Sequence, residues 1–336
     1  MKLAVIGTGY WGINLVRTFA SLEVLDCLSD ADTGRANEVA GRFGTRVAPS
    51  YEEILENLAI GAVVISTPAE THYELARRAL LAGKDVFVEK PITLRCSDCL
   101  DLIELAERKH CILMVGHLLK FHPAICRLKE LVSSGTLGKI EYIYSNRLNL
   151  GKVRHEENAL WSFAPHDISV ILWLLNNELP IQVSATGGTY LQANIADVTV
   201  SNLLFDRGVR AHIFVSWLHP YKEQKLVVIG SEAMACFDDV AKENKLQVFT
   251  KSIGLTNGRF TTQTPVGTPV HYDAAEPLSL ECRHFLDCIA TRSAPLTDGR
   301  DGLRVLSVLQ TSQRSLQLNG EPVQVRLTSL EPVLMN

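Results

Sequence analysis

The 336-residue sequence lacks any long hydrophobic run. Its apolar stretches fall short of the ~20 residues that cross a bilayer, and the first of them, residues 3–6, is far shorter than the apolar part of a secretory signal. A strong excess of charge is also missing, since the formal net charge is -4. A protein with this small negative net charge has no positive electrostatic field that would attract a nucleic acid backbone or an anionic membrane surface. We therefore expect a cytoplasmic protein that binds neither membranes nor nucleic acids.

The eight cysteines lack the dense spacing of a secreted disulfide scaffold. One CxxC pair, Cys96 and Cys99, stands alone, whereas a zinc site of this type needs a second pair. We interpret both as packing residues of a helix. His, Asp and Glu are dispersed without a metal-ligand spacing, so the sequence predicts no metal.

Strands and helices alternate up to about residue 118. Hydrophobic residues make up 46% of the chain, enough for two cores. In this part we expect strands at 3–6, 24–28, 62–66, 85–88 and 112–115, and helices at 13–21, 34–44, 52–57, 72–82 and 96–109. The alternation predicts an α/β Rossmann domain, in which helices cover both faces of a doubly wound parallel sheet.

The pattern changes after residue 118 to alternating, β-branched strands separated by turns. We expect helices at 123–133, 166–175 and 278–290, and strands at 140–148, 198–205, 209–217, 225–229 and 246–251. This pattern predicts an α+β domain with a large open, mainly antiparallel sheet. The expected domains are therefore residues 1–118 and 119–336.

A glycine-rich motif joins the first strand to the first helix. Gly7, Gly9 and Gly12 form a GxGxxG motif in which Tyr10 and Trp11 precede the last glycine. The three glycines allow a tight turn, a close approach of the backbone to a pyrophosphate, and close packing of helix and strand. The helix N-terminus adds amide donors and a positive dipole. We interpret these five residues as part of a dinucleotide site.

Asp30 follows the second strand, roughly 20 residues after the motif, as expected for the ribose ligand. A carboxylate there accepts hydrogen bonds from the ribose hydroxyls and repels a 2′-phosphate, so NAD is favoured over NADP. Asp32 competes for the same role, and Arg35 leaves tolerance of NADP open. In the alternative interpretation, the glycines serve an ordinary turn and Asp30 caps the next helix.

Three further segments complete a family pattern: Ser66-Thr67-Pro68 with His72, Glu89-Lys90-Pro91, and Pro165-His166-Asp167. With the glycine motif they resemble the Gfo/Idh/MocA family of oxidoreductases along nearly the whole chain. The resemblance implies a Rossmann domain followed by a substrate-binding domain, and homodimers or homotetramers packed through the open sheets. It also implies cofactor contacts for Thr67, Pro68, His72, Glu89 and Lys90.

The resemblance places the family's lysine on Lys90 and its helix histidine on His166. Oxidation of an alcohol needs a base for the hydroxyl proton, and imidazole titrates near neutrality. We favour His166 as this base and Lys90 as the group that orients the hydroxyl, although the two roles could be exchanged. Lys90 could instead bind only the ribose, and His166 could only pack its helix. The family's aspartate four residues before the histidine is Ser162 here, which we keep as a substrate contact.

The segment from Asn146 to Ile171 resembles the nucleotide-sugar branch of the family. Within it, Arg147, Lys152 and Arg154 could hold a diphosphate, although a solvated basic loop explains them as well. His117, after the last Rossmann strand, could line the sugar site, although packing in the core or at the surface explains it as well.

We therefore expect NAD-dependent oxidation of the 3-hydroxyl of UDP-N-acetylglucosamine, in the synthesis of lipopolysaccharide precursors. Four alternatives stay open: oxidation of the corresponding uronate, NAD(P)H-dependent reduction of a ketosugar, dehydrogenation of a polyol or inositol, and non-catalytic regulation by a bound dinucleotide.

Overall fold

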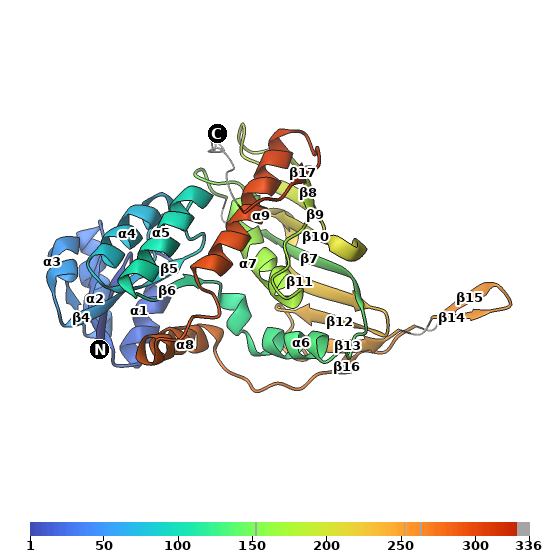
Figure 1. Cartoon of the computed structure of the whole chain (residues 1–336), viewed down its shortest axis with the longest axis horizontal. Helices are drawn as coiled ribbons and strands as arrows, with labels where there is room; N and C mark the ends of the chain where they lie inside the picture. Colours follow the sequence, from blue (N-terminus) through green and yellow to red (C-terminus); the bar gives the residue numbers. More distant parts are fainter. Residues whose placement is uncertain (152, 252, 263, 328–336) are drawn as a thin grey trace. The chain divides into compact units, whose positions relative to one another are not determined.

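The computed structural model describes residues 1–151, 153–251, 253–262 and 264–327. The chain divides into two compact units (Figure 1). The first contains mainly residues 1–121 and 275–306, and the second contains mainly residues 122–274 and 307–326. The sequence predicted one break, after residue 118, so the return of residues 275–306 to the first unit is the main difference.

The first unit is built on a six-stranded sheet whose strands are all parallel, in the order β3-β2-β1-β4-β5-β6. The strands are β1 (Lys2–Ile6), β2 (Leu25–Ser29), β3 (Arg46–Val47), β4 (Ile60–Ile65), β5 (Asp85–Glu89) and β6 (Leu113–Gly116). The order reverses between β1 and β4. Sheets of this kind bind ligands at the carboxyl ends of the strands, beside the reversal. The predicted doubly wound fold is confirmed.

Five helices connect these strands: α1 (Gly12–Ser21), α2 (Thr33–Phe43), α3 (Tyr51–Glu56), α4 (His72–Leu81) and α5 (Cys96–Lys109). Each predicted helix in this part is observed with ends that differ by no more than one residue. Cys96 and Cys99 are buried in α5, as a packing role requires. All eight cysteines lie in the described part of the chain, and no disulfide joins them.

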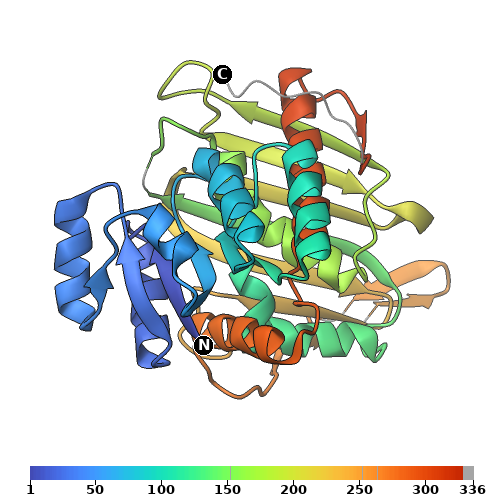
Figure 2. The same ribbon diagram turned by 60° about the vertical axis from the view of Figure 1, so that its left-hand side comes forward.

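The second unit contains a nine-stranded sheet in the order β16-β13-β12-β11-β7-β10-β9-β8-β17, seen in Figure 2. Among the described strands of this sheet, only β7 and β10 pair in parallel, so the sheet is mixed and mainly antiparallel. The strands are β7 (Ile140–Leu150), β8 (Gln182–Gly188), β9 (Val198–Leu204), β10 (Arg210–Ser216), β11 (Leu218–Gly230), β12 (Ala233–Asp238), β13 (Leu246–Thr250), β16 (Thr268–Pro269) and β17 (Val323–Gln324). A separate hairpin joins β14 (Ile253–Thr256) to β15 (Arg259–Thr262).

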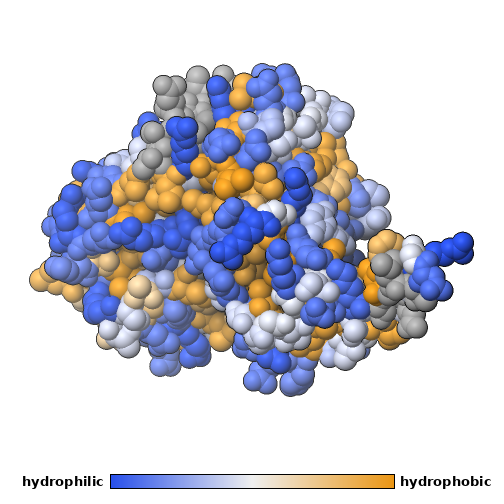
Figure 3. Space-filling model, turned by 45° about the vertical axis from the view of Figure 1, so that its right-hand side comes forward, coloured by the Kyte–Doolittle hydropathy of each residue, from blue (hydrophilic) through white to orange (hydrophobic). Residues whose placement is uncertain are grey.

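Helix α7 (Ala159–Leu174) covers one face of this sheet, and α6 (Pro123–Ser133) packs beside it. Arg147 of β7 contacts Asp167 of α7. Because side chains alternate along a strand, Tyr142 and Tyr144 lie on the opposite face. Tyr144 is half-buried there and stacks on His212, with ring centroids 5.4 Å apart. Figure 3 shows one side of the molecule, where hydrophobic residues lie among hydrophilic ones.

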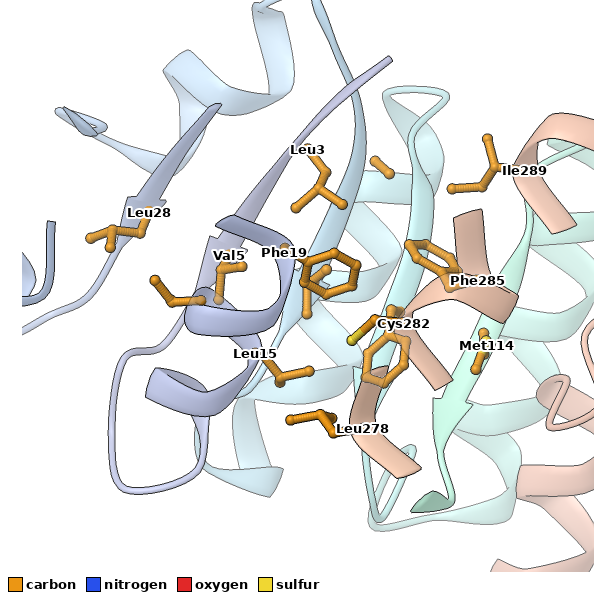
Figure 4. Close-up of a cluster of buried hydrophobic side chains, with 14 of the residues drawn as sticks. Leu3, Val5, Leu15, Phe19, Leu28, Met114, Leu278, Cys282, Phe285 and Ile289 are labelled. Atoms are coloured by element: carbon orange, nitrogen blue, oxygen red, sulfur yellow. The ribbon is translucent and has the colours of Figure 1, made fainter. Parts of the chain in front are cut away.

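The predicted helix at 278–290 is observed as α8 (Pro277–Thr291), but it belongs to the first unit rather than to the open-sheet domain. Leu278, Cys282 and Phe285 are buried in one cluster with Phe19 (Figure 4). The ring of Phe285 meets Phe87 edge-on, with centroids 5.7 Å apart. Burying each such side chain contributes about 1.5–3 kcal/mol. The periodicity predicted the helix correctly, whereas its partner sheet is determined by long-range packing.

The first turns of α7 and one further α-helix were not predicted. The expected helix at 166–175 is the later part of α7, which begins at Ala159 because Asn158 caps it by accepting a hydrogen bond from the Trp161 amide. Pro165 lies inside α7, and because proline usually ends a helix it concealed the first turns. Helix α9 (Gly299–Gln317) was not predicted at all. Several of its buried side chains are hydroxyls, such as Thr311, which bonds to the carbonyl oxygen one turn back. Buried hydroxyls conceal the apolar periodicity. Within the residues described, no helix has the length and apolar content that bilayer crossing requires.

Candidate active site

The glycine motif lies where β1 ends and α1 begins. Gly7 has a φ of +90°, which favours glycine. A Cβ on Gly12 would overlap the Gly7 carbonyl oxygen, whereas a Cβ on Gly9 would meet nothing within 4 Å. The turn is therefore tight on its inner side and open at Gly9. This geometry fits the pyrophosphate of a dinucleotide, which needs close approach to the backbone and to the helix N-terminus.

Asp30 directly follows β2 and is anchored to the glycine motif. Its Oδ2 accepts hydrogen bonds from the Thr8 amide at 2.6 Å and the Thr8 hydroxyl at 2.8 Å. Its Oδ1 is 2.6 Å from the Arg35 guanidinium. Burial opposes ionisation, but the hydrogen bonds from Arg35 and Thr8 hold the pKa of Asp30 at about 2. Asp32 instead caps α2, so Asp30 is better placed for a ribose.

We expect the Asp30→Ala variant to lose selectivity for NAD over NADP by at least ~10-fold, which corresponds to about 1.4 kcal/mol. The variant loses the repulsion of a 2′-phosphate and releases Arg35 from its ion pair. Titration of protein fluorescence with NAD and NADP would give both dissociation constants. Arg35→Ala is the matched control and should change the ratio in the opposite direction. An unchanged ratio in Asp30→Ala would assign the ribose contact to another residue.

Glu89, at the end of β5, connects the glycine motif to Lys90. Its Oε1 accepts a hydrogen bond from the Trp11 indole at 2.5 Å, and its Oε2 accepts one from the Lys90 amide at 3.2 Å. The carboxyl group lies against Gly116, where a Cβ would come within 2.9 Å of it. These contacts fix the loop that carries the glycines relative to Lys90. A direct contact of Glu89 or Trp11 with the cofactor stays a prediction.

A second carboxyl, that of Glu281 in α8, is completely buried and escaped sequence reasoning. Neither of its oxygens has a hydrogen-bond partner among the described residues. Burial and repulsion by Glu89 raise the pKa of Glu281 well above its usual value. Burial also raises the pKa of Glu89 to about 7, although Trp11 and Lys90 oppose the shift. Glu281 is therefore protonated at neutral pH, and Glu89 becomes fully charged only at a pH above neutral.

This carboxyl pair predicts that stability falls as the pH rises from about 5 to 8. In that window the folded state retains a proton on Glu89 that the unfolded chain has lost, so the free energy of unfolding decreases with pH. Glu281→Gln removes the proton that Glu281 likewise retains in the folded state, so it should flatten the decrease, with a gain of at least ~1 kcal/mol at pH 8. Urea unfolding at about pH 5 and pH 8 measures the free energy of unfolding, and Glu38→Gln, at an exposed position, is the control. Equal slopes in Glu281→Gln and the parent protein would contradict this electrostatic account.

Lys90 follows β5 and His72 is the first residue of α4, both after the carboxyl ends of adjacent strands of the sheet. Lys90 is half-buried, and its charge adds to burial in lowering the pKa of His72. The His72 ring nitrogens lie 2.8 Å from the Pro91 carbonyl and 2.9 Å from the Thr67 carbonyl. Burial keeps this ring neutral, so it donates to one carbonyl at a time. His72 thus holds together the two segments that carry Thr67-Pro68 and Lys90, while its predicted cofactor contact stays untested.

In the second unit, His166 is half-buried on α7, and Ser162 precedes it by one turn. The Ser162 hydroxyl donates a hydrogen bond to Glu157 at 2.7 Å. Asp167, the residue after His166, is buried and accepts two hydrogen bonds from Arg147, at 2.9 and 3.1 Å. This bidentate pair anchors α7 to β7.

The predicted phosphate region is largely neutralised by its own carboxylates. Arg147 pairs with Asp167, and Arg154 pairs with Glu157 at 3.1 Å. Lys152 lies outside the described residues. A phosphate would have to displace these ion pairs, so the assignment of Arg147 and Arg154 to phosphate stays a prediction.

Beside this segment the second unit has a small polar pocket near the N-terminus of α7. Its lining includes Glu156, Glu157, Asn158, Trp161 and Gln313. Asn158 and Trp161 both donate hydrogen bonds to the Gln313 side chain, which fixes the wall of the pocket. Two carboxylates favour hydroxyl groups over phosphate as the occupant.

Comparison with known proteins identifies the class of this protein. Residues 1–117 match the oxidoreductase family with an NAD-binding Rossmann fold, and residues 125–236 match the GFO/IDH/MocA C-terminal domain. The chain therefore belongs to the Gfo/Idh/MocA family, and the predicted family and cofactor are confirmed. It is an NAD-dependent oxidoreductase that acts on CH–OH groups of sugars or polyols.

Two kinds of relative are similar along nearly the whole chain. UDP-N-acetylglucosamine 3-dehydrogenase of Acidithiobacillus ferrooxidans is 28% identical over 308 residues, 91% of this chain and 94% of that protein. A solved structure of that enzyme matches with a TM-score of 0.84 and 26% identity, covering 95% of this chain and 98% of the other. scyllo-Inositol 2-dehydrogenase (NAD(+)) of Bacillus subtilis is 27% identical over 341 residues, 97% of this chain and 96% of that protein.

Proposed function

We propose that this enzyme oxidises the 3-hydroxyl of UDP-N-acetylglucosamine to a ketone with NAD. The observation that carries the proposal is the similarity, in sequence and in structure, to the Acidithiobacillus ferrooxidans 3-dehydrogenase along nearly the full length of both chains. A 3-keto sugar is ready for transamination, which suits the synthesis of amino sugars for lipopolysaccharide. We infer a cytoplasmic location from this proposed role in the synthesis of lipopolysaccharide precursors.

Oxidation of the alcohol breaks its C–H and O–H bonds, and the hydride and the proton leave to different acceptors. Bound NAD supplies the hydride acceptor. The turn at Gly9 would hold its pyrophosphate, and the carboxylate of Asp30 would hold its ribose. His166 takes the hydroxyl proton as general base. Lys90 donates a hydrogen bond to the same oxygen and stabilises the negative charge that develops on it.

A polyol dehydrogenase is the second candidate, because one structural observation favours it. Two of the cations expected to bind a diphosphate, Arg147 and Arg154, are paired with Asp167 and Glu157, and the nearby pocket contains two carboxylates. A neutral polyol needs no phosphate site. The similarity to scyllo-inositol 2-dehydrogenase covers the chain equally well.

We further propose that the enzyme is a homodimer or homotetramer assembled through the open face of the nine-stranded sheet. Tyr142, Tyr144 and His212 lie half-buried on this face, opposite α7. Aromatic residues of this kind are enriched in protein interfaces. Sedimentation of the purified protein would give the oligomeric state.

Single-turnover formation of NADH tests the proposed reaction. NAD-loaded protein is mixed in parallel with UDP-N-acetylglucosamine, its uronate, free N-acetylglucosamine and myo-inositol, and the NADH absorbance is followed. A rise with UDP-N-acetylglucosamine alone supports the proposal. A rise with myo-inositol alone assigns the enzyme to polyols. If none of the four compounds produces NADH although NAD is bound, the result favours a ketosugar reductase or a non-catalytic sensor.

A further inference from the structure

A buried ionic cluster in the first unit joins His117, Lys120 and Asp301. His117 follows β6, Lys120 lies in the 3-10 helix η2 (Leu118–Phe121), and Asp301 lies in the first turn of α9. His117 Nδ1 is 2.9 Å from Asp301 Oδ2, and Lys120 Nζ is 2.5 Å from Asp301 Oδ1. All three side chains are at most 1% exposed. The proposed roles of Lys90, His166 and Asp30 do not use this cluster.

The backbone positions Asp301 independently of its side chain. The Thr297 carbonyl accepts a hydrogen bond from the Val115 amide at 2.8 Å, which attaches the segment before α9 to β6. Asp298 accepts a hydrogen bond from the Asp301 amide at 2.8 Å and so caps the start of α9. Both contacts persist when Asp301 is replaced by a residue of the same shape. An Asp301→Asn variant should therefore fold.

The charges around Asp301 favour a neutral His117. Lys120 compensates the carboxylate, and the Arg304 guanidinium lies 3.7 Å from it. Burial lowers the pKa of His117; Asp301 opposes this effect, while the charges of Lys120 and Lys90 add to it. Burial alone would raise the pKa of Asp301, but its bonds to His117 and Lys120 lower it. The pair is therefore an ionised carboxylate and a neutral imidazole.

This charge state selects one tautomer of His117. An ionised carboxylate only accepts hydrogen bonds, so the ring nitrogen that faces Asp301 must carry the proton. A neutral ring with its proton on Nδ1 has an unprotonated Nε2, which is a hydrogen-bond acceptor.

His117 stands next to Lys90 at the edge of the sheet where ligands bind. Glu89 of β5 pairs with Gly116 of β6, so Lys90 and His117 are the next residues on two adjacent parallel strands. Neighbouring strands are about 4.8 Å apart. The electrostatic effect of Lys90 on His117 agrees with this register. Both residues follow the carboxyl ends of their strands, where doubly wound sheets bind their substrates.

We propose that His117 contacts the sugar: its Nε2 accepts a hydrogen bond from a hydroxyl that neighbours the one oriented by Lys90, and Asp301 is the positioning residue that keeps the ring proton on Nδ1. This inference rests on the proposed oxidation of a sugar or polyol. A neutral acceptor suits a hydroxyl group, whereas it gives no attraction to phosphate. The cluster would thus contribute to recognition of the ring being oxidised.

Kinetics of three variants test the contact. His117→Asn retains an amide donor that can reach Asp301 but lacks Nε2, and Asp301→Asn retains the shape but not the charge. Each should raise KM for the sugar about 10-fold or more and leave kcat within ~3-fold, because a contact made equally in ground and transition states affects KM. Affinity for NAD should not change. The control is His110→Asn, at an exposed helix end in the left-handed conformation that asparagine tolerates.

Nuclear magnetic resonance of the ¹⁵N-labelled histidine rings tests the tautomer without any turnover. The His117 signals are those missing in His117→Asn. In the parent protein they should report a protonated Nδ1 and an unprotonated Nε2, and Asp301→Asn should mix the two tautomers. Addition of UDP-N-acetylglucosamine or myo-inositol to NAD-loaded protein should shift the Nε2 signal of His117.

Two results would overturn the inference: a proton on Nε2 in the parent protein, or an unchanged KM in His117→Asn for a sugar that the parent protein oxidises. If the parent protein oxidises neither sugar, the proposed function fails and the sugar contact fails with it. The ring spectrum still decides, in that case, whether Asp301 fixes the tautomer.

Discussion

Replacement of Lys90 by methionine should lower turnover at least ~100-fold and leave NAD affinity nearly unchanged. Methionine preserves most of the length and apolar surface of the side chain but cannot donate a hydrogen bond to the hydroxyl or stabilise the charge that develops on its oxygen. Single-turnover NADH formation measures the loss, and fluorescence titration measures NAD affinity. Because the charge of Lys90 opposes the effect of burial on Glu89, the variant should also raise the pKa of Glu89 further.

The matched control for Lys90→Met is Lys109→Met, at the exposed end of α5. It removes the same charge from the first unit at a distance from the sheet edge, so it should turn over normally. If Lys90→Met and Lys109→Met are equally slow, the loss of turnover comes from impaired folding of the variants, and the assigned role of Lys90 is wrong. If Lys90→Met loses affinity for NAD instead of turnover, Lys90 is a ribose ligand alone.

Replacement of His166 by alanine should also lower turnover at least ~100-fold, because no other group is assigned to take the hydroxyl proton. Alanine is a good helix former, so α7 should persist. Free imidazole added to the His166→Ala variant should partly restore turnover by replacing the missing base, and single-turnover NADH formation measures both effects. The control is His271→Ala, at an exposed position of the second unit.

The two variants together decide which group is the proton acceptor. Imidazole rescue in His166→Ala assigns that role to His166. Retained turnover in His166→Ala with a large loss in Lys90→Met would transfer the role to Lys90. Near-normal turnover in both His166→Ala and Lys90→Met would contradict the proposed mechanism, whichever sugar is the substrate.

Local patterns predicted the first unit well. The glycine motif predicted the turn between β1 and α1 because the roles of Gly7 and Gly12 depend on backbone atoms a few residues away. Apolar periodicity predicted the five helices that connect the parallel strands to within one residue at each end. Lys90 was recognisable because it stands in a family motif directly after a strand.

Residues whose roles depend on distant partners were not recognisable in the sequence. Asp301 bonds to a histidine 184 residues away, and it resembles any acidic residue in the first turn of a helix. Glu281 belongs to an ordinary amphipathic helix, and its complete burial follows from where that helix packs. For the same reason the sequence did not reveal that Arg147 pairs with Asp167, and its assignment to a phosphate stays a prediction.

By itself, the sequence determined the Rossmann fold, the family, the NAD cofactor and the residues that follow the strand ends. These properties arise from periodicity and turn chemistry, which act over a few residues. Only the tertiary structure decided that α8 covers the parallel sheet, that Arg147 is paired with Asp167, and that Asp301 contacts the ring of His117. Each of these contacts joins residues far apart in the chain, and the identity of a buried group's partner depends on packing that no local pattern encodes.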